Sequence, residues 1–308
     1  MASNPRVSAI VIFLDEERFL DAAIESVRAQ SFEDWELLLV DDGSSDRSPE
    51  IARRHAHSDP DRIRYLDHAG HANLGMSVSR NAGIAAARGE LVAFLDADDV
   101  WLPNRLARGV ALLDANPRAN MVYGRTQYWS SWAGERETGS DWVQPHGFRA
   151  EKTVEQPELL RMFLAGEAAL PCMGSLTLRR RAGLECGGFV EEFRGLYEDQ
   201  AFLARFCLDH AVYVSDEHWD RYRQHPDSAC ATAARSDVAE RARSAYYAWL
   251  TALLDSRGLR GTALWDAAIR ARTPAGRPWT TRALQAVRQA LRRVVASADA
   301  VSRTGGRP

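Results

Sequence analysis

The segment 91–101, Leu-Val-Ala-Phe-Leu-Asp-Ala-Asp-Asp-Val-Trp, constrains the fold more than any other part of the chain. A short apolar run bounded by polar residues is typical of a strand that is buried on both faces of a sheet. This run ends in three carboxylates, Asp96, Asp98 and Asp99. Because ligands of open α/β sheets bind beyond the carboxyl ends of the strands, we expect these side chains to lie at a binding site.

Carboxylates crowded this closely repel one another, and they stay ionised together only when a cation or hydrogen-bond donors compensate their charge. A hard divalent ion with oxygen ligands meets that need. The alternative is structural, because Asp98 or Asp99 can cap a helix that begins near Pro103. The sequence therefore predicts a metal site or a helix cap at this strand end.

Apolar runs alternate with amphipathic segments before this strand. Strands are expected over 7–14, 35–40 and 63–66, and helices over 17–29, through 51–52 and over 77–87. This alternation predicts a parallel sheet that is covered on both faces, with a Rossmann-like arrangement. The second strand also ends in carboxylates, Asp41 and Asp42, so we expect two acidic strand ends side by side. No G-x-G-x-x-G follows the first strand, which argues against a dinucleotide-dependent oxidoreductase.

The composition is that of an ordinary globular protein. The 308 residues are enough for one large α/β domain or for a domain with a helical appendage. We expect no export signal and no membrane-spanning segment, because no apolar run of the required length occurs. The four cysteines are widely spaced, which is typical of reduced thiols. The sequence therefore predicts a cytoplasmic location.

The net charge of −3 hides an asymmetry, because residues 231–308 hold 14 Arg but only 5 Asp or Glu. Within this basic tail, residues 282–303 have the pattern of a basic amphipathic helix. Such a helix can lie on the inner face of an anionic membrane. It can also pack on the catalytic body or form a homodimer, which we favour because its apolar face lacks Trp and Phe. Nucleic-acid binding is not expected, since it rests on the basic tail alone.

Four segments together carry a family resemblance: Val-Ser-Ala-Ile-Val at 7–11, Val-Asp-Asp-Gly-Ser-Ser-Asp at 40–46, Ser-Val-Ser-Arg-Asn-Ala-Gly-Ile at 77–84 and Phe-Leu-Asp-Ala-Asp-Asp at 94–99. In this order they resemble the successive motifs of family 2 glycosyltransferases. The resemblance implies a GT-A fold, a mixed and mainly parallel sheet flanked by helices. It implies a catalytic domain over 1–230, with a nucleotide-sugar half to about 125 and an acceptor half over 126–230. A helical, basic extension over 231–308 follows.

The implied activity is transfer of a sugar from a nucleotide-sugar donor, most often a UDP-sugar, to a hydroxyl of a glycan, a lipid-linked acceptor or a small molecule. The implied setting is synthesis of cell-envelope polysaccharide or glycoconjugates. Mg²⁺ or Mn²⁺ is expected at Asp96 and Asp98, with His225 of the Arg-x-His element as a third ligand. The expected donor nucleotide-binding residues are Phe13, Asp15, Asp41, Arg80, Asp96, Ala97 and Arg223. Asp41 would accept a hydrogen bond from the N3–H of a uracil or similar base. The alternative role for Asp96 is to bind the ribose hydroxyls instead of the metal.

On the acceptor side, the family places its catalytic base in a Glu-Asp pair after a Gly-Gly-Phe segment. Here the pair is Glu198 and Asp199, so the resemblance assigns the base to Asp199 and implies inversion at the anomeric carbon. Glu198 and Trp101 are expected to contact the acceptor. The structural alternative is that the acidic pair only stabilises a helix N-terminus.

Two features separate this chain from common family patterns. Phe13, Leu14 and Asp15 stand where other residues usually flank the nucleobase. The Gln-x-x-Arg-Trp element of processive members is missing, which indicates an enzyme that adds a single sugar. Trp129, Trp132 and Trp142 either pack on a sugar ring or fasten a long loop to the body. Two other functions stay open from the sequence: a phosphatase or phosphotransferase that uses the D-x-D carboxylates, and a non-catalytic nucleotide-sugar binding protein.

Overall fold

The computed structural model describes residues 4–133, 140–233 and 238–273. The strands of its sheet are β1 (Val7–Phe13), β2 (Trp35–Asp41), β3 (Ile63–Asp67), β4 (Leu91–Asp96), β5 (Val100–Trp101), β6 (Met121–Trp129), β7 (Trp142–Val143), β8 (Lys152–Val154), β9 (Thr177–Arg179) and β10 (Val212–Arg223). The α-helices are α1 (Leu20–Arg28), α2 (Ser48–Ser58), α3 (Met76–Ala86), α4 (Arg105–Ala115), α5 (Glu158–Ala165), α6 (Arg180–Glu185), α7 (Glu198–Asp209), α8 (Ala229–Ala233), α9 (Val238–Ser256) and α10 (Ala263–Arg272). Short 3₁₀ turns are η1 (Ala69–His71), η2 (Ser131–Ala133) and η3 (Met173–Ser175).

The strands form one mixed sheet in the order β3-β2-β1-β4-β9-β6-β10-β5, with β7 beside β6 and β8 beside β10. The first four strands of this order are parallel to one another. Beyond them, β9 runs antiparallel to both β4 and β6, and β10 is parallel to β6 but antiparallel to β5 and β8. The predicted mixed sheet flanked by helices is confirmed, and its parallel part is the half built by the first hundred residues.

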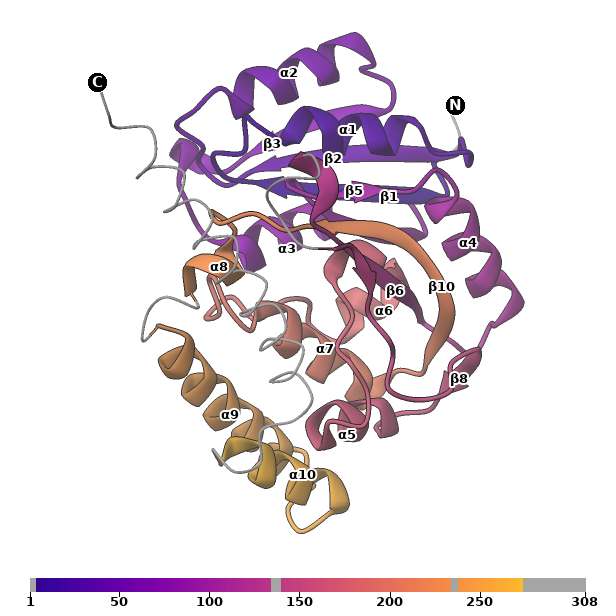
Figure 1. Cartoon of the computed structure of the whole chain (residues 1–308), viewed down its shortest axis with the longest axis vertical. Coiled ribbons are helices and arrows are strands. Elements are labelled where there is room, and N and C mark those ends of the chain that lie inside the picture. Colours follow the sequence, from indigo (N-terminus) through magenta and orange to yellow (C-terminus); the bar gives the residue numbers. More distant parts are fainter. Residues whose placement is uncertain (1–3, 134–139, 234–237, 274–308) are drawn as a thin grey trace.

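Helices cover both faces of the parallel half (Figure 1). Along β1 the side chains alternate between two cores, as the period of a strand requires. Ile10 and Ile12 belong to the core that contains Ile84 of α3. Ala9 and Val11 belong to the core that contains α1. Burial on both faces explains why these strands appear in the sequence as continuous apolar runs.

Helix α3 approaches β1 closely at Gly83. A Cβ atom at this position would lie 2.6 Å from Cγ2 of Ile10, closer than real side-chain contacts. Glycine is therefore required here for packing. Arg80 lies one turn earlier on the same helix, so the close contact also fixes how Arg80 meets the ends of the strands.

The C-terminal region is helical over the residues that the structure describes. Tyr246, Leu250 and Leu254 of α9 and Leu264 of α10 belong to the same core as α5 and α7 (Figure 1). The boundary at 230 stays a prediction, and the amphipathic segment 282–303 lies outside the described residues. Within the ranges 4–133, 140–233 and 238–273, none of the helices is both long and apolar enough to cross a membrane.

Candidate active site

The carboxyl ends of β1, β2 and β4 meet at one edge of the sheet. In the strand register, Phe13 stands opposite Asp41 and Ile12 stands opposite Asp96. This arrangement arises because the three strands pair in parallel and their apolar runs end at nearly the same level of the register. The two acidic strand ends therefore lie at the same edge of the sheet, as expected, but they are not side by side, because β1 lies between β2 and β4.

Asp41 is fully buried below this edge. One of its oxygens accepts a hydrogen bond from the amide of Ser44 (2.9 Å), and the other accepts one from the hydroxyl of Tyr65 (2.8 Å). Burial and the Asp41 carboxylate raise the pKa of Tyr65. Asp15 is exposed and accepts hydrogen bonds from the amides of Ser45 (2.6 Å) and Asp46 (3.2 Å). Both aspartates thus hold the loop after β2 in place.

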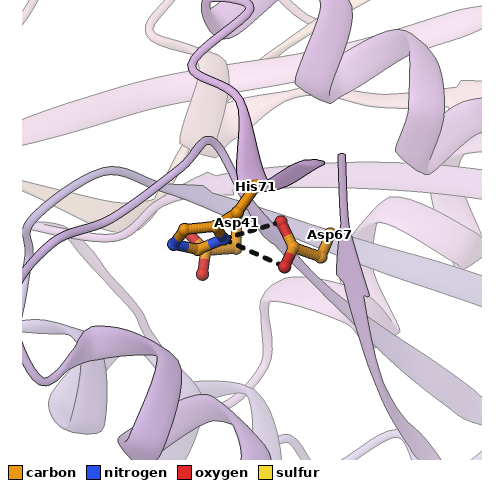
Figure 2. Close-up of side chains that lie close together, drawn as sticks. All are labelled: Asp41, Asp67 and His71. Atoms are coloured by element: carbon orange, nitrogen blue, oxygen red, sulfur yellow. Dashed lines mark hydrogen bonds and ion pairs between the residues drawn. The ribbon is translucent and has the colours of Figure 1, made fainter. Parts of the chain in front are cut away.

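Asp41, Asp67 and His71 lie close together, with one donor atom of each within 4.8 Å of the others (Figure 2). Nδ1 of His71 lies 2.9 Å from an oxygen of Asp67, and Nε2 lies 2.8 Å from the carbonyl oxygen of Ser44. These two contacts raise the pKa of His71. Because both ring nitrogens face oxygen acceptors, an imidazolium satisfies them both. We therefore interpret the cluster as an ion pair rather than as a metal site.

The carboxylates after β4 have separate partners. Asp98 Oδ2 accepts a hydrogen bond from Nε2 of His225 (3.0 Å), and the backbone oxygen of Asp98 accepts one from Nε of Arg223 (2.6 Å). Asp99 is buried and accepts a hydrogen bond from the amide of Arg223 (2.7 Å). Ala97, between the aspartates, packs in the core. Helix α4 starts at Arg105 without a side-chain cap, so the helix-cap alternative for Asp98 and Asp99 is wrong.

Negative charge is in excess around this strand end. Burial, followed by the charge of Asp98, raises the pKa of Glu16 to about 8. Burial and the charges of Asp98 and Asp96 also raise the pKa of Asp99 well above its ordinary value. The side chains of Asp96 and Asp98 remain 34% and 16% exposed, so their oxygens are accessible from the solvent. Nδ1 of His225 is buried without a hydrogen-bond partner. Surplus charge with open oxygens is a donor set that fits Mg²⁺ or Mn²⁺.

Arg80 connects the strand end with the acidic pair of α7. Its side chain is only 2% exposed, and it donates to Asp96 Oδ1 (2.7 Å) and to Glu198 Oε1 (3.3 Å). Burial alone would lower the pKa of Arg80, but these two carboxylates raise it above its ordinary value. One buried cation thus joins two carboxylates that are about a hundred residues apart in the sequence.

Asp199 follows Glu198 in the first turn of α7. One oxygen of Asp199 accepts a hydrogen bond from the amide of Gln200 (2.7 Å). Burial, and next the charge of Glu198, raise the pKa of Asp199 from 3.8 to about 7, although Arg80 opposes this shift. A carboxyl group that titrates near neutral pH suits general acid–base catalysis.

Aromatic rings surround Arg223. Its guanidinium carbon lies 4.6 Å from the ring centre of Trp129, 4.7 Å from that of Phe19 and 5.0 Å from that of Trp132. The Trp132 indole also donates to the carbonyl oxygen of Gln224 (2.8 Å). These contacts support the structural interpretation of the tryptophans, since they fasten the loop to β10. The ring of Trp142 stacks on Tyr128 of β6, at 4.3 Å between ring centres, and so fastens β7 to β6.

Trp101 is a buried residue of β5, the strand that pairs with β10. Its side chain is 3% exposed, and its indole nitrogen donates to the carbonyl oxygen of Gly174 (2.9 Å). Acceptor contact by Trp101 stays a prediction that this buried position does not favour. In contrast, direct contacts link Arg80, Asp96 and Glu198, and others link Asp98, Arg223 and His225. Sequence reasoning missed Glu16 and Phe19, because neither belongs to a recognised motif.

Comparisons with known proteins agree with this architecture. The model of the family described as "Glycosyl transferase family 2" matches residues 8–188. The uncharacterized glycosyltransferase EpsJ of Bacillus subtilis is 32% identical over 266 residues, which cover 85% of this chain and 73% of EpsJ. For four other curated relatives, the chain spans only 24% to 43% of their length.

Two solved structures share the fold. Staphylococcus aureus TarS, in complex with UDP-GlcNAc, has a TM-score of 0.64 at 18% identity, over 89% of this chain and 74% of that chain. The mannosyltransferase PcManGT of Pyrobaculum calidifontis, in complex with GDP-Man and Mn²⁺, has a TM-score of 0.54 at 18% identity. The match covers 94% of this chain and 86% of PcManGT.

The mixed sheet with carboxylates at its strand ends thus has the GT-A fold, as predicted. More specifically, this chain belongs to glycosyl transferase family 2. Membership of this family leaves the phosphatase alternative without support.

Proposed function

We propose that the protein transfers a sugar from a nucleoside-diphosphate sugar to an acceptor hydroxyl, with metal assistance and inversion of configuration. The observation that carries this proposal is the buried Arg80, which joins Asp96 of the strand end to Glu198 beside Asp199. Candidate metal ligands and a candidate base therefore belong to one site. Cell-envelope polysaccharide or glycoconjugate synthesis is the setting that the family resemblance favours.

On the donor side, Asp98 and Asp96 would hold Mg²⁺ or Mn²⁺, with His225 as the third ligand; Nε2 of His225 lies 3.0 Å from Asp98 Oδ2. When bound, the ion neutralises charge that develops on the leaving diphosphate. Arg223 adds positive charge from β10. Support for a nucleotide-sugar donor comes from the structural neighbours, of which TarS is in complex with UDP-GlcNAc and PcManGT with GDP-Man and Mn²⁺. We propose a UDP-sugar.

The nucleobase is proposed to bind where β1 and β2 end, at Phe13, Asp15 and Asp41. In this structure Asp41 has no exposed surface, and its two oxygens are held by Ser44 and Tyr65. Contact between Asp41 and a base therefore requires local movement of Ser44 or Tyr65.

On the acceptor side, Asp199 would remove the proton of the acceptor hydroxyl. At the same time, the oxygen of that hydroxyl attacks the anomeric carbon. The bond from that carbon to the diphosphate oxygen breaks, and its electron pair leaves with the diphosphate. The proton stays on the Asp199 carboxylate. A single displacement of this kind inverts the anomeric centre, so the assignment of Asp199 and the prediction of inversion depend on each other.

Donor binding gives the direct test of this proposal. Calorimetry with UDP-, GDP-, dTDP- and CMP-sugars should detect binding of one nucleotide class that strengthens with Mn²⁺. The Asp98→Asn variant should lose this metal dependence, because a neutral amide is a much weaker ligand for Mn²⁺ than a carboxylate. Asp34→Asn, an exposed change just before β2 and at the opposite sheet edge, serves as the matched control. Failure of every nucleotide sugar to bind the wild type would contradict the proposal.

The pH dependence of transfer gives a second prediction. With the pKa of Asp199 raised to about 7, the base is protonated at lower pH, so kcat/KM should fall about tenfold per pH unit below 7 and level off above it. Glu198→Gln removes a charge that raises this pKa, so the acid limb should move to lower pH. Profiles between pH 5 and 9 at saturating Mn²⁺ measure the shift. An unmoved limb would assign the titration to another group.

A further inference from the structure

An open cavity of about 610 Å³ lies between the loop 192–196, helix α8 and the first half of α9. We call it the α8–α9 groove. Its apolar lining includes Phe193, Leu196, Ala229, Ala242, Ala245 and Trp249. The volume falls within the range of about 300–1,000 Å³ that small-molecule sites occupy.

Both walls of the groove continue into the candidate active site. The loop 192–196 passes through Tyr197 directly into Glu198 and Asp199 at the start of α7. On the other side, α8 begins four residues after His225. The groove therefore adjoins the acceptor side of the reaction centre and is not a remote surface feature.

The walls of the groove are held by specific contacts. The carbonyl oxygen of Phe193 accepts a hydrogen bond from the Ser77 hydroxyl of α3 (2.7 Å). The Phe193 ring meets Trp249 of α9 edge to face, with ring centres 5.6 Å apart. Tyr197 stacks on Tyr246 of α9 at 5.1 Å. Loop and helix are thus fixed against each other, and the groove is preformed.

Two charged side chains, Glu192 and Arg194, are also part of the groove's lining. Arg194 and Glu192 are exposed, and Arg194 donates to the carbonyl oxygen of Asn73 (2.7 Å). The apolar interior offers few partners for sugar hydroxyls, and burying unpaired hydroxyls is costly. An alkyl chain loses no hydrogen bonds on entering such a groove and gains by leaving water.

We propose that the α8–α9 groove binds the alkyl chain of an amphiphilic acceptor, whose hydroxyl-bearing head lies at Asp199. This inference rests on the proposed glycosyl transfer and specifies its acceptor class. The chain in the groove holds the acceptor, while Asp199 acts only on the hydroxyl that reacts.

The test uses hexyl, heptyl and octyl β-glucoside as probes, each below its micelle concentration, with binding to the full-length protein measured by calorimetry. Each added methylene that enters the groove should tighten binding about fourfold. Binding that is independent of chain length would overturn the proposal. Calorimetry with UDP on the same preparation reports the donor site separately, so failure here is distinguishable from failure of the proposed function.

A matched pair of variants locates the binding. Ala245→Trp fills the groove, whereas Ala248→Trp places the same side chain at an exposed position one turn along α9, outside the lining. Ala245→Trp should abolish the dependence on chain length, and Ala248→Trp should keep it, with UDP binding equal in both. Equal effects of the two variants on glucoside binding would overturn the proposal.

Two other occupants would give different results. If octyl glucoside bound more tightly to the Leu291→Glu variant than to the wild type, the C-terminal segment of this chain would be the competing occupant of the groove. If light scattering detected a dimer of the wild type, and the Ala245→Trp variant were a monomer, the occupant of the groove would be a second copy of the chain. Either result would overturn binding of an acceptor chain.

Discussion

The Asp199→Asn variant is expected to lower kcat by a factor of about 10²–10⁴, the usual contribution of a general base. Asparagine keeps the size of the side chain but cannot take the acceptor proton. The hydrogen bond from the amide of Gln200 to the side-chain oxygen can persist, so the start of α7 should keep its geometry. Donor affinity, measured by calorimetry, should stay that of the wild type, because Asp199 lies on the acceptor side.

The control for this prediction lies at the other end of the same helix. Asp209→Asn removes a surface ion pair with Arg257, and such pairs contribute little to stability. Its transfer rate should match that of the wild type. If Asp199→Asn retained more than a tenth of the wild-type rate, the base would have to be another group, and the prediction of inversion would lose its support.

The parallel half of the sheet was predictable from the sequence for a physical reason. Strands β1, β2 and β4 are buried on both faces, so each one appears as an uninterrupted apolar run. The point where each run stops places its polar residues at the sheet edge. The positions of Asp41 and Asp96 follow from this rule alone, without knowledge of the family.

Strand β10 was not predicted, although it is the longest strand in the described part of the chain. Its interior mixes buried and exposed positions, and its register with β6 shifts between Val214 and His218 and again before Asp220. It therefore lacks both an apolar run and a regular alternation. The buried Asp220 lies beside Thr126, which satisfies it with a hydrogen bond of 3.0 Å. Pairing with β6 determines this strand, and only the fold reveals that pairing.

The contacts that assemble the candidate site were also hidden from the sequence. The resemblance indicated Arg80 as a donor-side cation, but not its pairing with Glu198, which is 118 residues away. Phe19 precedes α1 and belongs to no recognised motif, yet its ring lies against Arg223 and His225. Contacts of this length depend on how the layers pack, and no local pattern encodes them.

The Arg80→Met variant is expected to lower the free energy of unfolding by about 3–5 kcal/mol, because it leaves two partners of a buried cation uncompensated. Methionine fills a similar volume, so loss of packing contributes little. The Arg80 side chain is buried. Its contacts with Asp96 and Glu198 connect α3 to both β4 and α7. Urea denaturation followed by circular dichroism measures the change. The corresponding exposed change, Arg181→Met on α6, should leave the unfolding midpoint unaltered.

A second variant separates the charge network from packing. If the loss in Arg80→Met comes from an unpaired carboxylate, adding Glu198→Gln should restore part of the stability, since the two sites are in direct contact and their effects are not additive. Simple addition of the two losses would show that Arg80 stabilises the protein by packing alone. Restored stability without restored transfer would mean that the same charges that hold α3, β4 and α7 together also set the electrostatics of Asp199. The network would then be a requirement of catalysis as well as of folding.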